Sequence, residues 1–214
     1  MAEQAALKPY RTVRNGSETE YVINRSRFIG RCFAVSSEAE ANAILERIRK
    51  QHWDATHNCF AYRLLSGVMR YSDDGEPQGT AGMPMLEVLK KRDLTDVLVM
   101  STRYFGGILL GAGGLVRAYT RSASDAVQKA GVLCMEPCTG FALQVAYPYW
   151  NAVQSVLERF GATESVNYGA QIDCLFRCKS EQTDAFLKAL SERTEARVSA
   201  KAVSEGYFGF PEEA

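Results

Sequence analysis

The chain of 214 residues has no excess of one charge, since 25 lysine and arginine side chains stand against 25 aspartate and glutamate side chains. Without bulk positive charge a protein does not hold nucleic acid by general attraction, so such binding would need a local patch. The sequence also lacks the roughly 20 consecutive apolar residues of a membrane-spanning helix. Its first residues, MAEQAALK, have neither the charged start nor the apolar core of a secretory signal. We therefore expect a cytoplasmic protein.

Histidine is scarce, with two residues, and the six cysteines follow no strong metal-binding pattern. They include two pairs with Cys-x3-Cys spacing, Cys134/Cys138 and Cys174/Cys178. Around the second pair, alternate residues of 172–178 would share one apolar strand face, which is typical of buried thiols. The spacing also differs from that of known zinc sites. We therefore predict reduced cysteines, and neither a metal nor a cofactor.

The most unusual stretch is 102–122, TRYFGGILLGAGGLVRAYTRS. Glycine reaches positive φ without strain and lets another chain or a ligand come close. A helix is expected from Gly113 to about Ala130, and the absence of acids from its first turn leaves its positive end open to an anion. Five glycines fall within nine positions: Gly106, Gly107, Gly111, Gly113 and Gly114.

Basic and aromatic side chains accompany these glycines. Arg117 and Arg121 are four residues apart and would share a helix face. An aromatic ring such as Tyr104 or Tyr119 could stack on a nucleic-acid base. The predicted ligand- or RNA-binding surface joins these residues and the glycines to Arg63 and Arg103. Glycine-rich strand-to-helix turns also occur simply to pack a helix on a sheet, so that alternative stays open.

A second unusual stretch, 70–82, reads RYSDDGEPQGTAG. Three acids fall within four residues, Asp73, Asp74 and Glu76, and they could hold Mg²⁺ or pair with Arg63, Arg70 or Arg103. An oxygen-ligand metal site needs more donors than one turn provides, so a solvated acidic turn is the commoner explanation. With His57, these acids form a candidate polar site.

The hydrophobic pattern of the first half predicts a β-β-α-β start, followed by a helix and an apolar strand. The glycine-rich turn at 106–114, which we call the glycine corner, then leads into a further helix. We expect Ser36 or Ser37 to cap the first helix and Thr80 the second. The expected strands are 20–24, 27–35, 58–63 and 96–102, and the expected helices cover 37–51, about 80–92 and 113–130.

Three sequence blocks resemble the IMPACT protein family: HNCFAYR at 57–63, YSDDGEPQGTAGMP at 71–84 and TRYFGGILLGAGGLVRAY at 102–119. The length and two-part layout are similar to the family's bacterial YigZ branch. The resemblance implies an α+β chain whose first domain, 1–136, has the fold of the second domain of ribosomal protein S5. It implies a second domain resembling the last domain of elongation factor G. Eukaryotic relatives regulate translation by binding a protein partner that controls a kinase.

The second half supports that layout independently. Its pattern, strand-helix-strand-strand-helix-strand, is the split ferredoxin-like arrangement, and we place this domain at 139–206. Residues 136–140 are expected to connect the domains, and 207–214 to form a tail. The expected strands are 141–147, 164–168, 171–178 and 196–203, with helices from Pro148 to Phe160 and from Ser180.

The first 138 residues carry a net charge of +3 and the remainder −3, so an RNA-binding role is better assigned to the first domain. Three functions stay open. The chain could bind RNA, the ribosome or a translation-associated protein, with arginines meeting phosphates. It could be an enzyme, with the glycine loop cradling phosphate, the acids holding Mg²⁺ and His57 moving a proton. It could be a protein-interaction module without a ligand. We prefer binding, because fold analogy is a weak basis for assigning chemistry.

Overall fold

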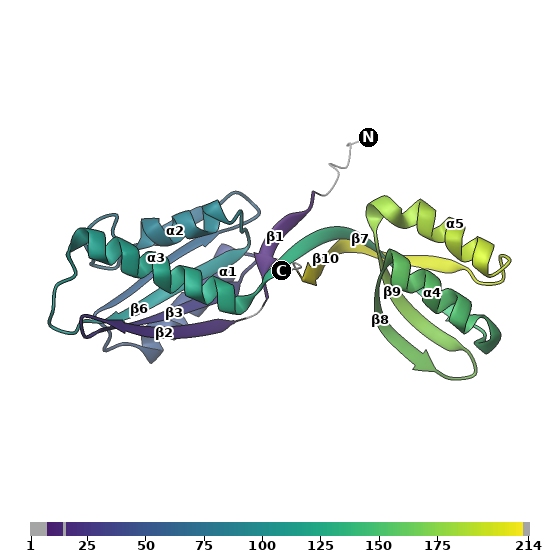
Figure 1. The fold of residues 1–214 in the computed structure, drawn as a ribbon, viewed down its shortest axis with the longest axis horizontal. Coiled ribbons are helices and arrows are strands. Elements are labelled where there is room, and N and C mark those ends of the chain that lie inside the picture. Colours follow the sequence, from purple (N-terminus) through teal and green to yellow (C-terminus); the bar gives the residue numbers. More distant parts are fainter. Residues whose placement is uncertain (1–7, 15, 212–214) are drawn as a thin grey trace. The chain divides into compact units, whose positions relative to one another are not determined.

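The computed structural model describes residues 8–14 and 16–211 (Figure 1). The chain divides into two compact units, consisting mainly of 10–134 and of 135–210. We refer to them as the N-terminal and C-terminal units. None of the helices in the described part of the chain has the length and apolar character that crossing a membrane requires.

The N-terminal unit contains an antiparallel five-stranded sheet with the order β2-β3-β6-β4-β5. Helices α2 and α3 cover one face and α1 covers the other. The elements are β1 (Tyr10–Val13), β2 (Ser17–Ile23), β3 (Ser26–Ala34), α1 (Glu38–Gln51), β4 (His57–Arg63), β5 (Met69–Ser72), α2 (Gly82–Lys91), β6 (Val97–Tyr104) and α3 (Gly111–Ala130).

Strand β6 is the centre of this sheet, and its sequence explains why. Val97 and Val99 face the core under α2 and α3, whereas Leu98 and Met100 face the core under α1. A strand buried on both faces reads as a continuous apolar run, which is how it was predicted from the sequence. The sequence missed β1 and β5, which are four residues each and too short to show a pattern.

The helix caps partly follow the prediction. Ser37 caps α1, since its hydroxyl accepts from the Glu40 amide at 3.2 Å, as expected. The predicted cap of α2 was wrong, because the Thr80 hydroxyl donates to the Pro77 carbonyl at 2.7 Å instead. Instead, the Asp73 side chain accepts hydrogen bonds from the backbone amides of Ala81 and Gly82 at the start of α2.

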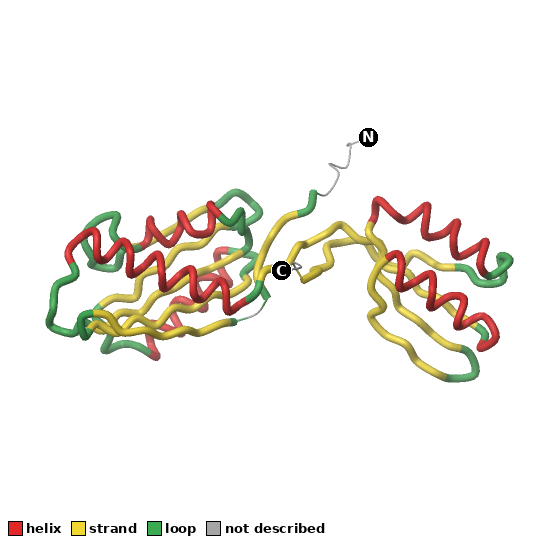
Figure 2. The backbone as a smooth tube through the Cα atoms, in the orientation of Figure 1, coloured by secondary structure: helices red, strands yellow, loops and turns green. Residues whose placement is uncertain are grey.

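The C-terminal unit has the predicted strand-helix-strand-strand-helix-strand succession. Its strands follow the order β7-β9-β8, and both β10 and β1 also pair with β7, which makes the sheet five-stranded. The two helices pack on one face through a core that includes Phe160, Phe176 and Phe186 (Figure 2). The elements are β7 (Val132–Val145), α4 (Trp150–Phe160), β8 (Gly161–Tyr168), β9 (Ile172–Lys179), α5 (Thr183–Arg193) and β10 (Ala200–Pro211), with short 3-10 turns at Tyr147–Tyr149 and Ser180–Gln182.

The structure differs from two expected boundaries. Residues 136–140, expected to connect the domains, are part of β7, and the two units divide within that strand, between Cys134 and Met135. Residues 207–211 of the expected tail belong to β10, and 212–214 lie outside the described residues. The domain limits 1–136 and 139–206 stay predictions.

The packing of α3 on the sheet predicts a steric effect at Gly30. A Cβ added there would lie 2.5 Å from the Ser122 carbonyl oxygen and 2.6 Å from its hydroxyl. We expect Gly30→Ala to lower the free energy of unfolding by about 1–3 kcal/mol, because α3 must shift. Urea unfolding followed by circular dichroism measures this. Gly206→Ala, with no atom within 4 Å of the added Cβ, is the matched control. Equal stability of the two variants would contradict the packing.

Candidate functional site

The three unusual sequence blocks meet at one pocket of about 370 Å³ in the N-terminal unit. We call it the three-block pocket. His57 reaches it from the start of β4, Glu76 from the turn after β5, and Arg103 and Phe105 from the end of β6. The loop before α3 and the first turns of that helix complete the wall, from Leu109 to Leu115. The volume lies within the range of roughly 300–1,000 Å³ that is usual for ligand pockets.

A buried ion pair forms the floor of the pocket. The Glu76 Oε1 atom accepts from the Arg103 guanidinium at 2.7 Å and from the Tyr119 hydroxyl at 2.7 Å. The Glu76 and Arg103 side chains are 3% and 5% exposed. Burial raises the pKa of the Tyr119 phenol well above its usual range, so the hydroxyl stays a donor to the carboxylate. The pair stabilises the fold only as long as both partners are present.

His57 faces the same carboxylate. Its Nδ1 lies 2.8 Å from the Asp74 carbonyl oxygen, which can only accept, so Nδ1 carries the hydrogen. Its Nε2 lies 3.7 Å from Glu76 Oε2, too far for a hydrogen bond. The ring is thus oriented by backbone, with one nitrogen toward the buried acid.

The acidic turn has structural partners. Asp73 accepts from the amides of Gly79, Ala81 and Gly82, and Asp74 accepts from the Asn58 amide at 2.6 Å. Asp74 is exposed and Asp73 partly exposed, as in a solvated turn, whereas Glu76 is buried and pairs with Arg103, the other alternative considered for these acids. Across residues 8–14 and 16–211, no three histidine, cysteine or acidic side chains converge as metal ligands would.

Two residues of the predicted binding surface lie inside the molecule. Arg103 is 4% exposed and Tyr119 is fully buried. As folded, both side chains bind Glu76, and neither lies on the open surface that was expected from the sequence. Arg63 lies at the other end of β4 and pairs with Asp93 at 3.0 Å, so the structure does not bring it to the glycine corner.

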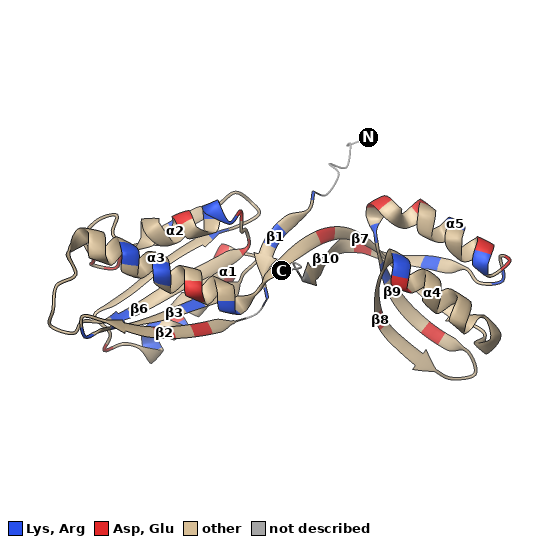
Figure 3. Cartoon of the chain, viewed as in Figure 1, with Lys and Arg blue, Asp and Glu red and all other residues tan. Residues whose placement is uncertain are grey.

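Of the remaining arginines in the predicted surface, Arg121 has an ion-pair partner and Arg117 has none among the described residues. Arg121 pairs with Asp125 at 3.3 Å and lies 4.4 Å from the Tyr21 ring. Arg117 is exposed and makes no ion pair with a described residue. Along α3 one acid, Asp125, interrupts the basic residues Arg117, Arg121 and Lys129 (Figure 3).

The glycine corner itself is open, but its surface is apolar. Gly107 and Gly111 have φ values of 82° and 68°, which glycine adopts without strain. Phe105 and Ile108 are 44% and 42% exposed, and Leu109 is 84% exposed. The exposure of these three residues was not predicted, although bulky apolar side chains beside glycines are a signal of a contact surface.

A hydrogen-bonded chain beside the corner was also missed. His52 Nε2 lies 2.6 Å from an Arg31 nitrogen, so Nε2 accepts and Nδ1 donates to the Tyr104 hydroxyl at 2.9 Å. The Tyr104 hydroxyl in turn donates to Asp54 at 3.2 Å. Tyr104, predicted as a base-stacking residue, is thus tied down and partly buried.

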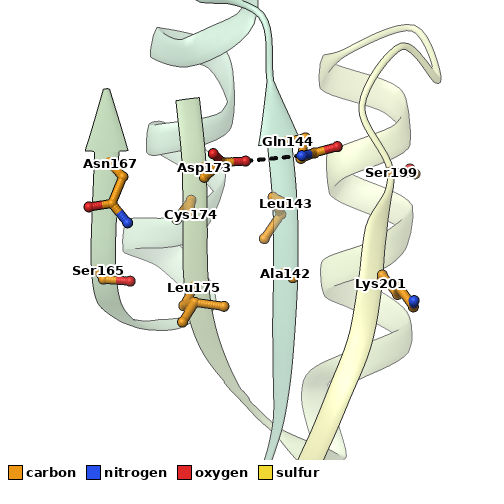
Figure 4. A pocket seen from close by; sticks show the side chains of 10 residues that line it. All are labelled: Ala142, Leu143, Gln144, Ser165, Asn167, Asp173, Cys174, Leu175, Ser199 and Lys201. Carbon is orange, nitrogen blue, oxygen red and sulfur yellow. Dashed lines mark hydrogen bonds between the residues drawn. The ribbon is translucent and has the colours of Figure 1, made fainter. Parts of the chain in front are cut away.

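The C-terminal unit has a hollow of about 390 Å³ on the sheet face opposite its helices (Figure 4). Gln144 donates to Asp173 at 3.1 Å across β7 and β9, and the small side chain of Ala142 leaves room below them. The cysteines of the β9 pair are buried thiols on the other face, as expected. Nothing in this hollow indicates the chemistry of an occupant.

The buried pair generates a prediction about stability. We expect Glu76→Ala to lower the free energy of unfolding by about 3–5 kcal/mol, because it leaves the Arg103 charge buried without its partner. Tyr119→Phe removes one hydrogen bond and should cost about 1 kcal/mol. Glu87→Ala, which breaks the exposed pair with Lys90, should cost about 0–1 kcal/mol. Urea unfolding measures all three. A Glu76→Ala loss no larger than that of Glu87→Ala would contradict this account.

The His52 chain generates a prediction about pH. Burial, and then the adjacent Arg31 charge, lower the pKa of His52 below its usual value near 6.5. As the pH falls below about 6.5, the unfolded chain therefore binds the proton first, and stability contributed by His52 is lost. Proton NMR of the two imidazoles should show His52 titrating below that value. Unfolding at a pH series should show less loss in His52→Gln, and a His52 pKa above the usual value would exclude the mechanism.

Comparison with known proteins identifies the family. The Impact N-terminal domain matches residues 24–127, and a domain of unknown function, DUF1949, matches 143–197. The chain is 40% identical to IMPACT family member YvyE of Bacillus subtilis over 198 residues, which is 91% of each chain. It is 36% identical to IMPACT family member YigZ of Escherichia coli over 141 residues, covering 63% of this chain and 68% of YigZ.

More distant likenesses agree. The Protein IMPACT homolog of Dictyostelium discoideum is 41% identical over 93 residues, covering 41% of this chain and 26% of that protein. A crystal structure described as that of a hypothetical protein is 28% identical and superposes with a TM-score of 0.60, covering 92% of this chain and 98% of the other. Because a relative similar over nearly its whole length and both domain matches agree, the chain belongs to the IMPACT family, in its bacterial YigZ-like branch.

Proposed function

We propose that this protein is a cytoplasmic, translation-associated regulator that acts by binding, and that its N-terminal unit carries the binding surface. The Protein IMPACT homolog of Dictyostelium discoideum and Protein IMPACT of Xenopus laevis each match 41% of the chain. The family resemblance links such relatives to translational control through a protein partner. A translation factor or a ribosome-associated protein is the partner class that this surface fits best.

One observation carries the proposal. The three sequence blocks that define the resemblance converge on the three-block pocket and its rim, although they are separated in the chain. The buried polar side chains of these blocks bind one another, as Glu76 and Arg103 do. The same blocks expose apolar side chains, for example Phe105 and Leu109. Exposed apolar groups gathered at a pocket favour a protein partner over the phosphate backbone of RNA.

The same geometry favours binding over catalysis. Glu76 is engaged by Arg103 and Tyr119, and Asp73 is engaged by backbone amides. The Cys59 thiol donates to the Asp73 carbonyl, and burial raises its pKa to about 12, so it is no thiolate nucleophile at neutral pH. The phosphate- or nucleotide-binding enzyme stays an alternative, supported only by the uncapped first turn of α3.

The fold names implied by the resemblance are part of this proposal. In the C-terminal unit, the strand order β10-β7-β9-β8 with both helices on one face supports a ferredoxin-like domain similar to the last domain of elongation factor G. In the N-terminal unit, the five-stranded antiparallel sheet with α2 and α3 on one face supports likeness to the second domain of ribosomal protein S5.

Co-sedimentation of the full chain with purified ribosomes, and with a salt-washed ribosomal factor fraction, tests the proposal. A contact made mainly by apolar groups should persist as the salt concentration rises. We expect Leu109→Ser to weaken the association by about tenfold or more, because it removes a central apolar anchor. Leu65→Ser, at the far end of β4 and 50% exposed, is the matched control and should leave it unchanged.

RNA binding predicts a different result in the same assay. The affinity would fall steeply with salt, and Arg117→Gln would reduce the slope by about one phosphate contact. Absence of any association with ribosomes, ribosomal RNA or factors at low salt would overturn the translation-associated proposal. Thermal stabilisation by a nucleotide with Mg²⁺ would favour the enzyme alternative instead.

A further inference from the structure

Five bulky apolar side chains remain exposed at one end of the N-terminal unit. We call this set the apolar end. Isolated exposed apolar residues are ordinary, but a set gathered from separate loops marks a contact surface. The set comprises Ile23 (38% exposed), Trp53 (83%), Phe105 (44%), Ile108 (42%) and Leu109 (84%).

Backbone contacts hold these loops side by side. The Ser26 hydroxyl in the β2–β3 hairpin accepts from the Gly106 amide at 3.3 Å, and Gly106 lies so close to Arg25 that a Cβ would not fit. The Thr56 amide donates to the Arg103 carbonyl at 2.9 Å, and the Thr56 hydroxyl accepts from the Phe105 amide at 3.0 Å. The apolar end is therefore a built surface, supported from below by the buried pair.

Two exposed arginines lie beside the apolar end. Arg25 and Arg117 are exposed and form no ion pair with any described residue. The adjoining loops also carry two exposed carboxylates, of which Asp54 accepts from Tyr104 and Asp74 accepts from the Asn58 amide. An approaching partner thus meets apolar groups flanked by two unpaired cations, which complement carboxylates.

We propose that the apolar end binds a protein segment whose bulky apolar side chains are flanked by aspartate or glutamate. One apolar anchor of that segment sits in the three-block pocket, against Phe105 and Leu109. The flanking carboxylates lie toward Arg25 and Arg117. This inference rests on the proposed function and adds the chemistry of the partner. The pocket favours this occupant because its rim is apolar and its buried charges neutralise each other.

A displayed library of random short peptides tests the inference, because it samples many candidate partner segments at once. Selection is made on the full-length protein, with counter-selection on an Ile108→Ser/Leu109→Ser double variant. We expect enrichment of peptides that combine leucine, isoleucine, phenylalanine or tryptophan with aspartate or glutamate. The most enriched peptide is then synthesised, together with a version in which lysines replace its acids, for measurement of affinity by fluorescence anisotropy.

The variants give quantitative expectations. Leu109→Ser should weaken binding of the acidic peptide by about tenfold or more. Arg117→Gln should weaken it by about threefold, mainly at low salt. Leu65→Ser should leave it unchanged. In a Trp150→Phe background, where Trp53 is the remaining tryptophan, binding should shift the Trp53 emission to the blue as the ring leaves water. Because Leu109 is 84% exposed, its substitution should not disturb the fold.

Several outcomes would overturn the inference. These are enriched peptides that bind Leu109→Ser as well as the native chain, a lysine version that binds as tightly as the acidic one, or binding of a single-stranded RNA oligonucleotide alone. If peptides fail while ribosomal co-sedimentation persists in Leu109→Ser, this inference falls and the proposed function stands. If the peptides bind as expected but neither ribosomes nor their factors associate, the surface chemistry stands and the translational role falls.

Discussion

The buried ion pair between Glu76 and Arg103 is the constraint on which the N-terminal unit depends. It joins the acidic turn to the last residues of β6, and Tyr119 extends it to α3. Three segments that are separated in sequence are thereby fixed at one end of the sheet. A buried pair of this kind contributes little net stability over an apolar core, but it strongly penalises any arrangement that separates its partners. Its effect is therefore on position: it fixes where the loops above it lie.

This constraint explains how much of the site could be predicted from the sequence. The spacing of apolar residues predicts most helices and strands, because burial on one or two faces leaves a periodic trace. The glycine corner was also predicted from local sequence, in this case from its glycines. Pairing of the acidic turn with Arg103 was one alternative, but the sequence could not select the Glu76–Arg103 pair, because the two residues are 27 positions apart and only the folded sheet brings them together. An arginine that reads as a surface cation was instead a buried structural one.

The boundary between the units shows the same limit. Residues 136–140 contain Pro137 and Gly140, which are common in loops, and the local pattern indicated a connection. In the structure β7 continues through them, and a Cβ at Gly140 would meet the ends of the Ser204 and Arg177 side chains, which would have to move. Short β1 and β5 were missed because four residues carry too little pattern. The limits of these strands depend on the strands with which they pair, and those lie far away in the sequence.

The distribution of polarity at the apolar end follows from these constraints. A loop rich in glycine has few side chains with which to anchor itself, so its position must come from what lies beneath it. Here the groups beneath are charged and hydrogen-bonded to each other, and they are no longer available to a ligand. The side chains left for recognition are those that the loop holds outward, above all Leu109. A polar interior thus produces an apolar contact surface, the reverse of what the arginines and glycines of the sequence indicate when taken alone.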